Sequence, residues 1–243
     1  MSLAQQPDPD SALKECCQDH CFHAFDALYC SLARADPIQP QFSDDTCPLF
    51  VTWNIKSNKS SGSYHLRGCI GSFDPLTLHQ GIADYALISA FRDSRFRRIE
   101  RKELPRLQCG ISLLVHFEDA ESYLDWTVGV HGILISFPHP SLLATNSSSS
   151  VPSPLSSQSY LPSTRLSHKR KFSATYLPDV MPEQGWTKLD AIDSAIRKAG
   201  WDGKITEELR RSITLRRYQS SKATATWDEY VAWREANGGE VSV

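Results

Sequence analysis

The chain has 243 residues, of which 40% are hydrophobic and 22% charged, with a formal net charge of −2 at pH 7. This composition excludes a fully disordered or fibrous protein, and the small net charge provides no global attraction to nucleic acid or anionic lipid. No apolar run approaches the roughly 18 residues of a membrane helix, and residues 1–10 lack the apolar core of a signal peptide. Seven cysteines, an odd number, indicate reduced thiols rather than a secreted disulfide framework. We therefore expect an intracellular protein of the cytoplasm or nucleus, without contact to membranes.

The first hundred residues predict a helix, a hairpin and a second helix. Residues 1–11 are polar and we expect them to be disordered. Apolar residues then recur at helical spacing from Leu13 to Leu32, and residues 49–55 and 66–70 alternate as two strands of a hairpin. Thr77 with Gln80 has the pattern of a capping box and predicts the start of the second helix. The predicted inner face of this helix consists of Leu78, Ile82, Tyr85 and Ser89.

Residues 138–168 differ in kind from their surroundings. Eleven serines and five prolines occupy these 31 positions, between strand-like runs at 133–137 and 171–177. Such a segment cannot bury enough apolar surface to offset the entropy lost on ordering. We expect a disordered insertion at the tip of a hairpin and not a linker between independent domains.

The last third of the chain alternates between helix and strand patterns. A helix is marked by Leu189, Ile192 and Ile196, and two short strands are predicted at 213–215 and 223–227. Thr226 with Glu229 predicts the cap of a final helix, and residues 236–243 are expected to form a disordered tail. A further strand is predicted at 109–115. Because helices and strands do not alternate in a strict βαβ order, the pattern favours an α+β fold with a mainly antiparallel sheet.

Seven stretches occur in the order seen in one known family. They are FVTWNI (50–55), LRGCIGSF (66–73), DSRF (93–96), EDAESYLDWTVGVHGI (118–133), ATYLPDV (174–180), EQGW (183–186) and IRKAG (196–200). On these motifs, LRGCIG above all, the chain resembles the AMMECR domain family, named from a human chromosomal region linked to Alport syndrome, midface hypoplasia and elliptocytosis. The resemblance covers residues 12–235 and is interrupted only by the insertion.

The resemblance implies a two-lobed α+β fold with a cleft between the lobes, and an intracellular protein whose biochemical activity is not established. The chain departs from the family in two places. Arg97 and Arg98 follow Phe96, where family members of the animal type have prolines, and the insertion at 138–168 is longer than the usual short hairpin.

LRGCIG is the sharpest candidate for a site. Strand alternation places Arg67, Cys69 and Gly71 on one face, and Gly68 and Gly71 predict a bulge or a close backbone approach by a ligand or another segment. Arg67 is expected to lower the pKa of the Cys69 thiol, and His131 in the family motif VGVHG is the candidate base for such a nucleophile. The alternative is a structural cysteine that packs as a small hydrophobe.

Residues 92–106 form the most basic stretch, with seven Lys or Arg against three Asp or Glu, a local balance of +4. Ser94 and Arg95 lie in it, and Arg95 together with Arg67 suits an anion such as a phosphate or carboxylate. A solvated charged loop explains the same run. Aromatic residues are few here, Phe91 and Phe96, so nucleic-acid binding is possible but not favoured.

Two further groups contain residue types that could form a metal site or an acid–base site. The first group consists of Cys16, Cys17, His20, Cys21 and His23. These residue types resemble a zinc site, but one helix carries them all and would spread their side chains around its axis. Cys17 and Cys21 also fall on the apolar stripe of this helix, so packing in the core is favoured. The second, Asp119, Glu121 and Asp125, is interpreted as surface turn residues. We predict no metal and, since no phosphate-binding glycine motif is present, no cofactor.

The leading hypothesis is a binding or regulatory module with a functional cleft at LRGCIG, whose partner is a protein or a small anionic ligand. The expected ligand contacts are Arg67, Gly68, Gly71, Ser94 and Arg95. The alternative is an enzyme with Cys69 as nucleophile and His131 as base, acting on a nucleic-acid or small anionic substrate. A third hypothesis is an interaction scaffold whose contacts lie outside the cleft.

Overall fold

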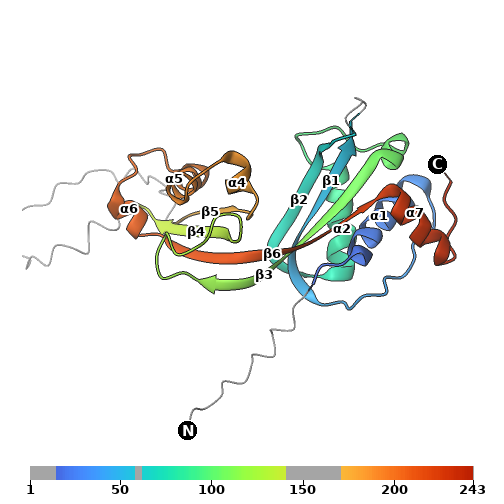
Figure 1. The fold of residues 1–243 in the computed structure, drawn as a ribbon, viewed down its shortest axis with the longest axis horizontal. Helices are drawn as coiled ribbons and strands as arrows, with labels where there is room; N and C mark the ends of the chain where they lie inside the picture. Colours follow the sequence, from blue (N-terminus) through green and yellow to red (C-terminus); the bar gives the residue numbers. More distant parts are fainter. Residues whose placement is uncertain (1–14, 58–61, 141–170, 243) are drawn as a thin grey trace, which may run out of the picture. The chain divides into compact units, whose positions relative to one another are not determined.

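The computed structural model describes residues 15–57, 62–140 and 171–242 (Figure 1). The expected disorder of residues 1–11 and of most of the insertion falls outside these residues. The chain divides into a first unit, residues 1–115 with 220–243, and a second unit, residues 116–219. Hydrogen-bonded strands follow the order β2 (Tyr64–Thr77), β1 (Thr46–Lys56), β3 (Leu107–Asp119), β6 (Thr214–Thr226), β4 (Gly132–Pro138) and β5 (Lys171–Tyr176). The pairs β1–β2, β1–β3, β4–β5 and β4–β6 are antiparallel, which confirms the α+β fold with antiparallel pairing.

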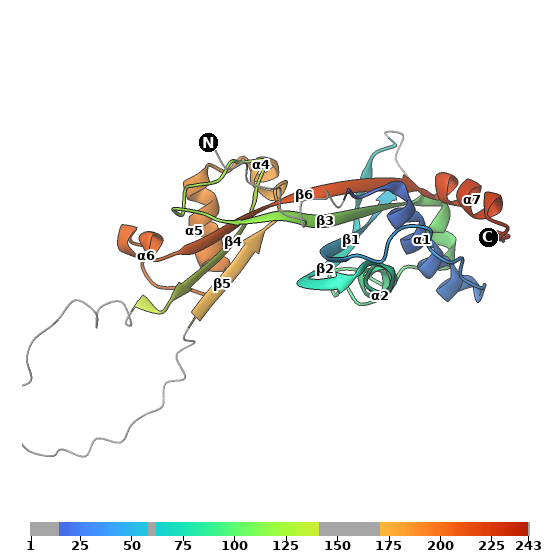
Figure 2. The ribbon, with the colours of Figure 1, turned by 90° about the horizontal axis from the view of Figure 1, so that it is seen from below.

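In the first unit, one face of the sheet is covered by helices. The elements are α1 (Gln18–Ala33), β1 (Thr46–Lys56), β2 (Tyr64–Thr77), α2 (Leu78–Phe91), the 3₁₀ helix η2 (Arg101–Arg106), α7 (Trp227–Ala236), and parts of β3 (Leu107–Asp119) and β6 (Thr214–Thr226). Alternate residues of β1, including Leu49, Val51 and Trp53, are fully buried in a core shared with α1 and α2. Both figures show α1 beside α2 within this unit (Figures 1 and 2). The other face of β1 carries half-buried residues and includes Thr52.

The start of α2 was predicted at the right residue but with the wrong cap. Thr77 is the N-cap, yet its side chain makes no capping hydrogen bond. The Leu78 N–H donates to the Asp45 carbonyl oxygen (2.8 Å), and the His79 N–H donates to Asp44 Oδ1 (2.8 Å). Acceptors from the segment before β1 therefore replace the capping box, since they satisfy two donors that the helix leaves open.

The prediction that Cys17 belongs to the core is wrong. Cys17 is exposed and is the N-cap of α1, which begins at Gln18. Its backbone N–H donates to His20 Nδ1 (3.0 Å), which closes the start of the helix. Cys21, one turn further, is buried as expected. Within the described residues, no group of three or more His, Cys, Asp and Glu is arranged to hold a metal ion.

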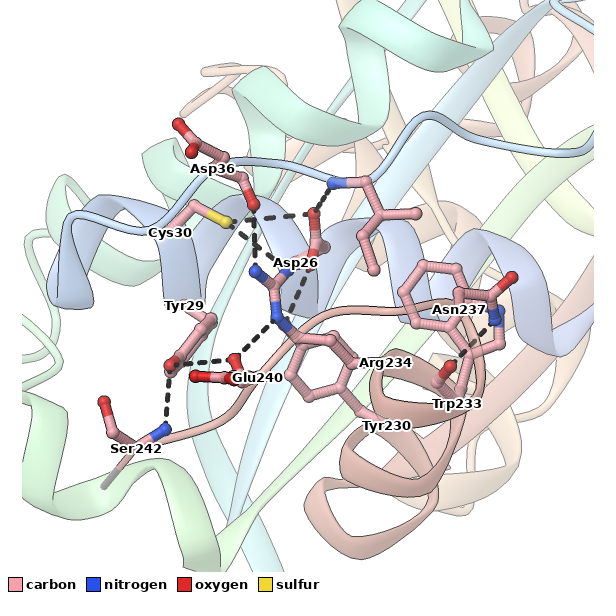
Figure 3. A network of polar contacts seen from close by, with 11 residues as sticks. Asp26, Tyr29, Cys30, Asp36, Tyr230, Trp233, Arg234, Asn237, Glu240 and Ser242 are labelled. Carbon is pink, nitrogen blue, oxygen red and sulfur yellow. Dashed lines mark hydrogen bonds and ion pairs between the residues drawn. The ribbon is translucent and has the colours of Figure 1, made fainter.

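A buried ion pair joins α1 to α7 in the first unit (Figure 3). Arg234 Nη1 bonds to Asp26 Oδ1, and the two side chains are 4% and 1% exposed. Tyr230 Oη donates to the same carboxylate (2.9 Å). Arg234 Nε also donates to the Glu240 carbonyl oxygen (3.2 Å), and the Ser242 N–H donates to Tyr29 Oη (3.0 Å). Residues 237–242, expected as a disordered tail, are thus bound to α1 and α7.

The second unit packs short helices on a sheet to which β3 and β6 also contribute. Its further elements are β4 (Gly132–Pro138), β5 (Lys171–Tyr176), α4 (Val180–Gln184), α5 (Lys188–Lys198) and α6 (Glu207–Arg211). Ile192 and Ile196 of α5 are fully buried, and Figure 2 shows α5 beside β4 and β5. Leu189, predicted on the same stripe, is 43% exposed. The two short strands expected at 213–215 and 223–227 are one continuous strand, β6.

The cap of α7 is confirmed, because Thr226 Oγ1 accepts from the Glu229 N–H while Glu229 Oε2 accepts from the Thr226 N–H.

Among the helices of the described residues, none combines the length and the apolar character that crossing a membrane requires.

Candidate functional site

The LRGCIG segment of β2 contains a β-bulge at Arg67. Trp53 of β1 is opposite Gly68, but the next residue, Asn54, is opposite Leu66, so Arg67 has no partner in the register. A bulge redirects the side chain of the extra residue and breaks the period of two. The predicted alternation, with Arg67 and Cys69 on one face, therefore does not hold. Cys69 lies opposite Thr52 on the half-buried face of the sheet.

Arg67 is bound to the segment that precedes β3. Its Nε and Nη2 donate to the two carboxylate oxygens of Glu103 (3.0 and 3.2 Å), and its Nη1 and Nη2 donate to the carbonyl oxygens of Arg97 (2.6 Å) and Arg98 (3.1 Å). The side chain is 13% exposed. A guanidinium with four such bonds fixes a loop, and its charge is already balanced by a carboxylate.

Gly68 and Gly71 mark close approaches of backbone, as predicted, and the approaching segments belong to the protein itself. A Cβ added to Gly68 would lie 2.3 Å from the carbonyl oxygen of Ser89 in α2. A Cβ on Gly71 would lie 2.2 Å from the carbonyl oxygen of Leu49 in β1. These glycines allow α2 and β1 to pack directly on the β2 backbone.

Asp93 and Arg95 cover the outer edge of β2 at Cys69. The Cys69 N–H donates to Asp93 Oδ2 (2.9 Å), and Arg95 Nη2 donates to the Cys69 carbonyl oxygen (3.1 Å). Because β2 is the first strand of the sheet, this side-chain pair takes the place of a neighbouring strand. Arg95 Nε and Nη2 bind both oxygens of Asp93 (2.9 and 2.7 Å), and these bonds hold the pKa of Asp93 well below its usual range. Ser94 between them is exposed.

The Cys69 thiol is half-buried, and Thr52 Oγ1 donates to its Sγ (3.1 Å). Burial raises the pKa of Cys69 above its ordinary value, and the Thr52 hydrogen bond and the charges of Arg95 and Lys222 offset this only in part. The expectation that Arg67 lowers the pKa of this thiol is therefore wrong. The cations that act on Cys69 are Arg95, which the sequence placed in the same cleft, and Lys222, which it did not. Desolvation outweighs both.

We expect Cys69 to react slowly with iodoacetamide at neutral pH. Since its pKa is raised, the thiol is protonated at pH 7, and its alkylation rate should climb only above about pH 8.5, where an ordinary thiol ionises. Exposed Cys17 in the same chain is the internal comparison. Peptide mapping by mass spectrometry between pH 6 and 10 measures both rates. Faster labelling of Cys69 than of Cys17 at pH 7 contradicts the prediction.

His131 belongs to the second unit, whereas Cys69 belongs to the first. Its Nδ1 accepts from the Thr127 N–H (3.0 Å), so the neutral ring carries its proton on Nε2. Burial, followed by the charge of Arg217, lowers the pKa of His131. In this tautomer Nε2 is a donor, and a role as the base for Cys69 requires the other tautomer.

Two carboxylates of the segment that precedes His131 are engaged in ion pairs with β6. Arg217 Nη1 lies 2.8 Å from Asp125 Oδ1, and Arg216 Nε lies 3.0 Å from Asp119 Oδ1. Asp125 Oδ2 also accepts from the Glu121 N–H (3.1 Å). The interpretation of these residues as surface residues agrees with the exposure of Asp119, whereas Asp125 is half-buried. Their arginine partners could not be read from the local sequence.

Comparison with known proteins places these features in a family. Residues 21–223 match the family model AMMECR1. An uncharacterized protein of Arabidopsis thaliana is 44% identical over 219 residues, which are 90% of this chain and 89% of that protein. An uncharacterized protein of Saccharomyces cerevisiae is 33% identical over 241 residues, covering 86% of each chain.

A solved structure shows the same fold. The crystal structure of an uncharacterized protein from Pyrococcus horikoshii aligns with a TM-score of 0.55 at 19% identity, over 85% of this chain and 89% of that chain. At this identity the likeness concerns the fold alone. The match to the family model covers most of the chain, and the chain belongs to the AMMECR1 family.

Proposed function

We propose that this chain is a binding module for a small anionic ligand, which it recognises at the Cys69 face. We define the Cys69 face as Thr52, Cys69, Arg95 and Lys222. The observation that carries the proposal is the Arg95 guanidinium, which Asp93 and the Cys69 carbonyl oxygen hold beside the half-buried thiol while 55% of its side chain stays exposed. The charge of Lys222 also acts on this thiol. Because the thiol is protonated, it brings no negative charge that would repel an anion from this face.

Arg95 is held in position and retains donors. Among the described residues, its side-chain hydrogen bonds use Nε and Nη2, so the two hydrogens on Nη1 remain for a ligand, and 55% of the side chain is exposed. A guanidinium whose orientation is already fixed loses little entropy when it binds. Asp93 and the Cys69 carbonyl oxygen supply that orientation.

Lys222 reaches the same face from β6. Thr52 is opposite Gly110 of β3, and the Cγ2 of Thr224 lies 3.8 Å from the Cβ position of Gly110. Lys222 is two residues before Thr224 and so projects to the same side of the strand. Burial lowers the pKa of Lys222. The residue is nevertheless exposed at the surface, so an anion can approach it from solvent.

A covalent role for Cys69 is less well supported than binding. A nucleophile requires the thiolate, whereas burial favours the neutral thiol. The neutral thiol accepts from Thr52 and keeps its own hydrogen as a donor. Cys69 thus serves an anion as one more polar contact.

Titration of the full chain with malonate, followed by NMR, tests the proposal. We expect saturable shifts of the Cys69 and Lys222 amide signals. Replacing Lys222 by Gln should weaken binding about tenfold, or about 1.4 kcal/mol, because one charge-assisted bond is lost. Lys56→Gln, which removes an exposed cation at the end of β1, is the matched control and should leave the affinity unchanged. Equal effects of the two substitutions, or the absence of saturable shifts, contradict the proposal.

A further inference from the structure

Two adjoining hollows lie on the surface of the first unit, and none of the four residues of the Cys69 face lines them. Their volumes are ≈ 570 and ≈ 540 Å³, and they share Ser31, Phe91 and Arg98. Their walls come from the ends of α1 and α2 and from residues 92–101. Residues 92–101 belong to the basic stretch that the sequence singled out, and Arg95 is the residue of this segment that the proposed function uses.

The two hollows differ in character. The smaller is lined by Arg97, Arg98 and Arg101, with Glu100 as its one acidic residue, and the Glu100 carboxylate is bonded to Lys102 Nζ (2.6 Å). The larger has an apolar wall made by Leu87, Ile88 and Phe91, flanked by Arg92 and Asp84. Together they offer a cationic end beside an apolar one.

The arginines at the cationic end are held by the LRGCIG motif. Arg67 donates to the carbonyl oxygens of both Arg97 and Arg98, so these two backbone groups are turned toward the β2 strand. The Arg98 guanidinium lies over the ring of Phe91, 4.9 Å from its centroid. Adjacent arginines with a fixed backbone, one of them stacked on an aromatic ring, are organised before a ligand binds.

We infer that the two hollows form a binding site for a phosphate monoester with an attached apolar group. The phosphate binds Arg97 and Arg98, whose forked donors match its oxygens, and the apolar group packs on Leu87, Ile88 and Phe91. Arg67 is a positioning residue, because it acts through the loop and its own charge is balanced by Glu103. The site is independent of the Cys69 face.

The test uses the full chain and isothermal titration calorimetry with phenyl phosphate and inorganic phosphate as probes. We expect phenyl phosphate to bind about tenfold more tightly, because its ring enters the apolar hollow. Arg98→Gln should weaken both probes at least about tenfold. Leu87→Ala should weaken phenyl phosphate only. Lys56→Gln, which removes a cation outside both hollows, should change neither.

Three results would overturn the inference. Equal weakening by Arg98→Gln and Lys56→Gln indicates attraction by overall charge instead of a site. Equal affinity for the two probes excludes the apolar hollow. If Lys222→Gln abolishes phenyl phosphate binding and Arg98→Gln does not, the anion binds at the Cys69 face. That result supports the proposed function and contradicts a site at the two hollows. Circular dichroism of each variant verifies that it folds.

Discussion

Replacing Arg234 with methionine is expected to destabilise the protein by about 3–5 kcal/mol, because it leaves the Asp26 carboxylate without its counter-charge in the core. Both side chains are almost fully buried, and Arg234 also binds the carbonyl oxygens of Asp36 and Glu240. The methionine side chain retains the apolar volume of the arginine stem. The loss therefore reports on the charge and its hydrogen bonds and not on a cavity.

Urea denaturation followed by circular dichroism measures this loss. The double variant Asp26→Asn with Arg234→Met should lose about 1–3 kcal/mol less than the sum of the two single losses, since removing the second charge relieves the first. Lys102→Met is the control, because its pair with Glu100 is exposed and should contribute at most about 1 kcal/mol. A loss from Arg234→Met no larger than that of the control contradicts the argument.

The ion pair also shows which parts of the fold local sequence can predict. Alternation identified β1, and the Thr226 and Glu229 pattern identified the start of α7, because both signals lie within a few residues. Asp26 and Arg234 are 208 positions apart, and nothing near either residue marks the other. For the same reason the predicted tail at 236–243 could not be recognised as a segment bound to Tyr29 and Arg234.

At the candidate site, residue types were predicted better than their partners. The glycines of LRGCIG indicated a close approach, and the structure supplies Ser89 and Leu49 as the approaching groups. Arg67 was predicted to lie on the same face of the strand as Cys69 because the two residues are two positions apart. A bulge at Arg67 turns its side chain away from that face. Arg95 lowers the pKa of Asp93. This pair did have a local signal, because an acidic residue stands two positions before an arginine, but Arg95 was interpreted as a ligand contact instead.

The glycines of β2 carry the second large prediction. Gly68→Ala and Gly71→Ala should each destabilise the protein by about 3 kcal/mol, because the new methyl group meets a backbone carbonyl that cannot rotate away. The would-be Cβ of Gly68 lies 2.3 Å from the Ser89 oxygen, and that of Gly71 lies 2.2 Å from the Leu49 oxygen. Relief requires α2 to move off β2 or β1 to shift along it.

Gly110→Ala in β3 is the matched control for these two substitutions. Its would-be Cβ has its nearest neighbours at 3.8 Å, an ordinary van der Waals distance, and it lies in the same sheet opposite Thr52. We expect a change within about 1 kcal/mol, with stabilisation as the favoured sign because alanine restricts the unfolded chain. Urea midpoints of the three variants measure the contrast. Similar midpoints for Gly68→Ala and Gly110→Ala would mean that α2 does not rest on the β2 backbone, and the explanation of the LRGCIG glycines as a packing requirement would then fail.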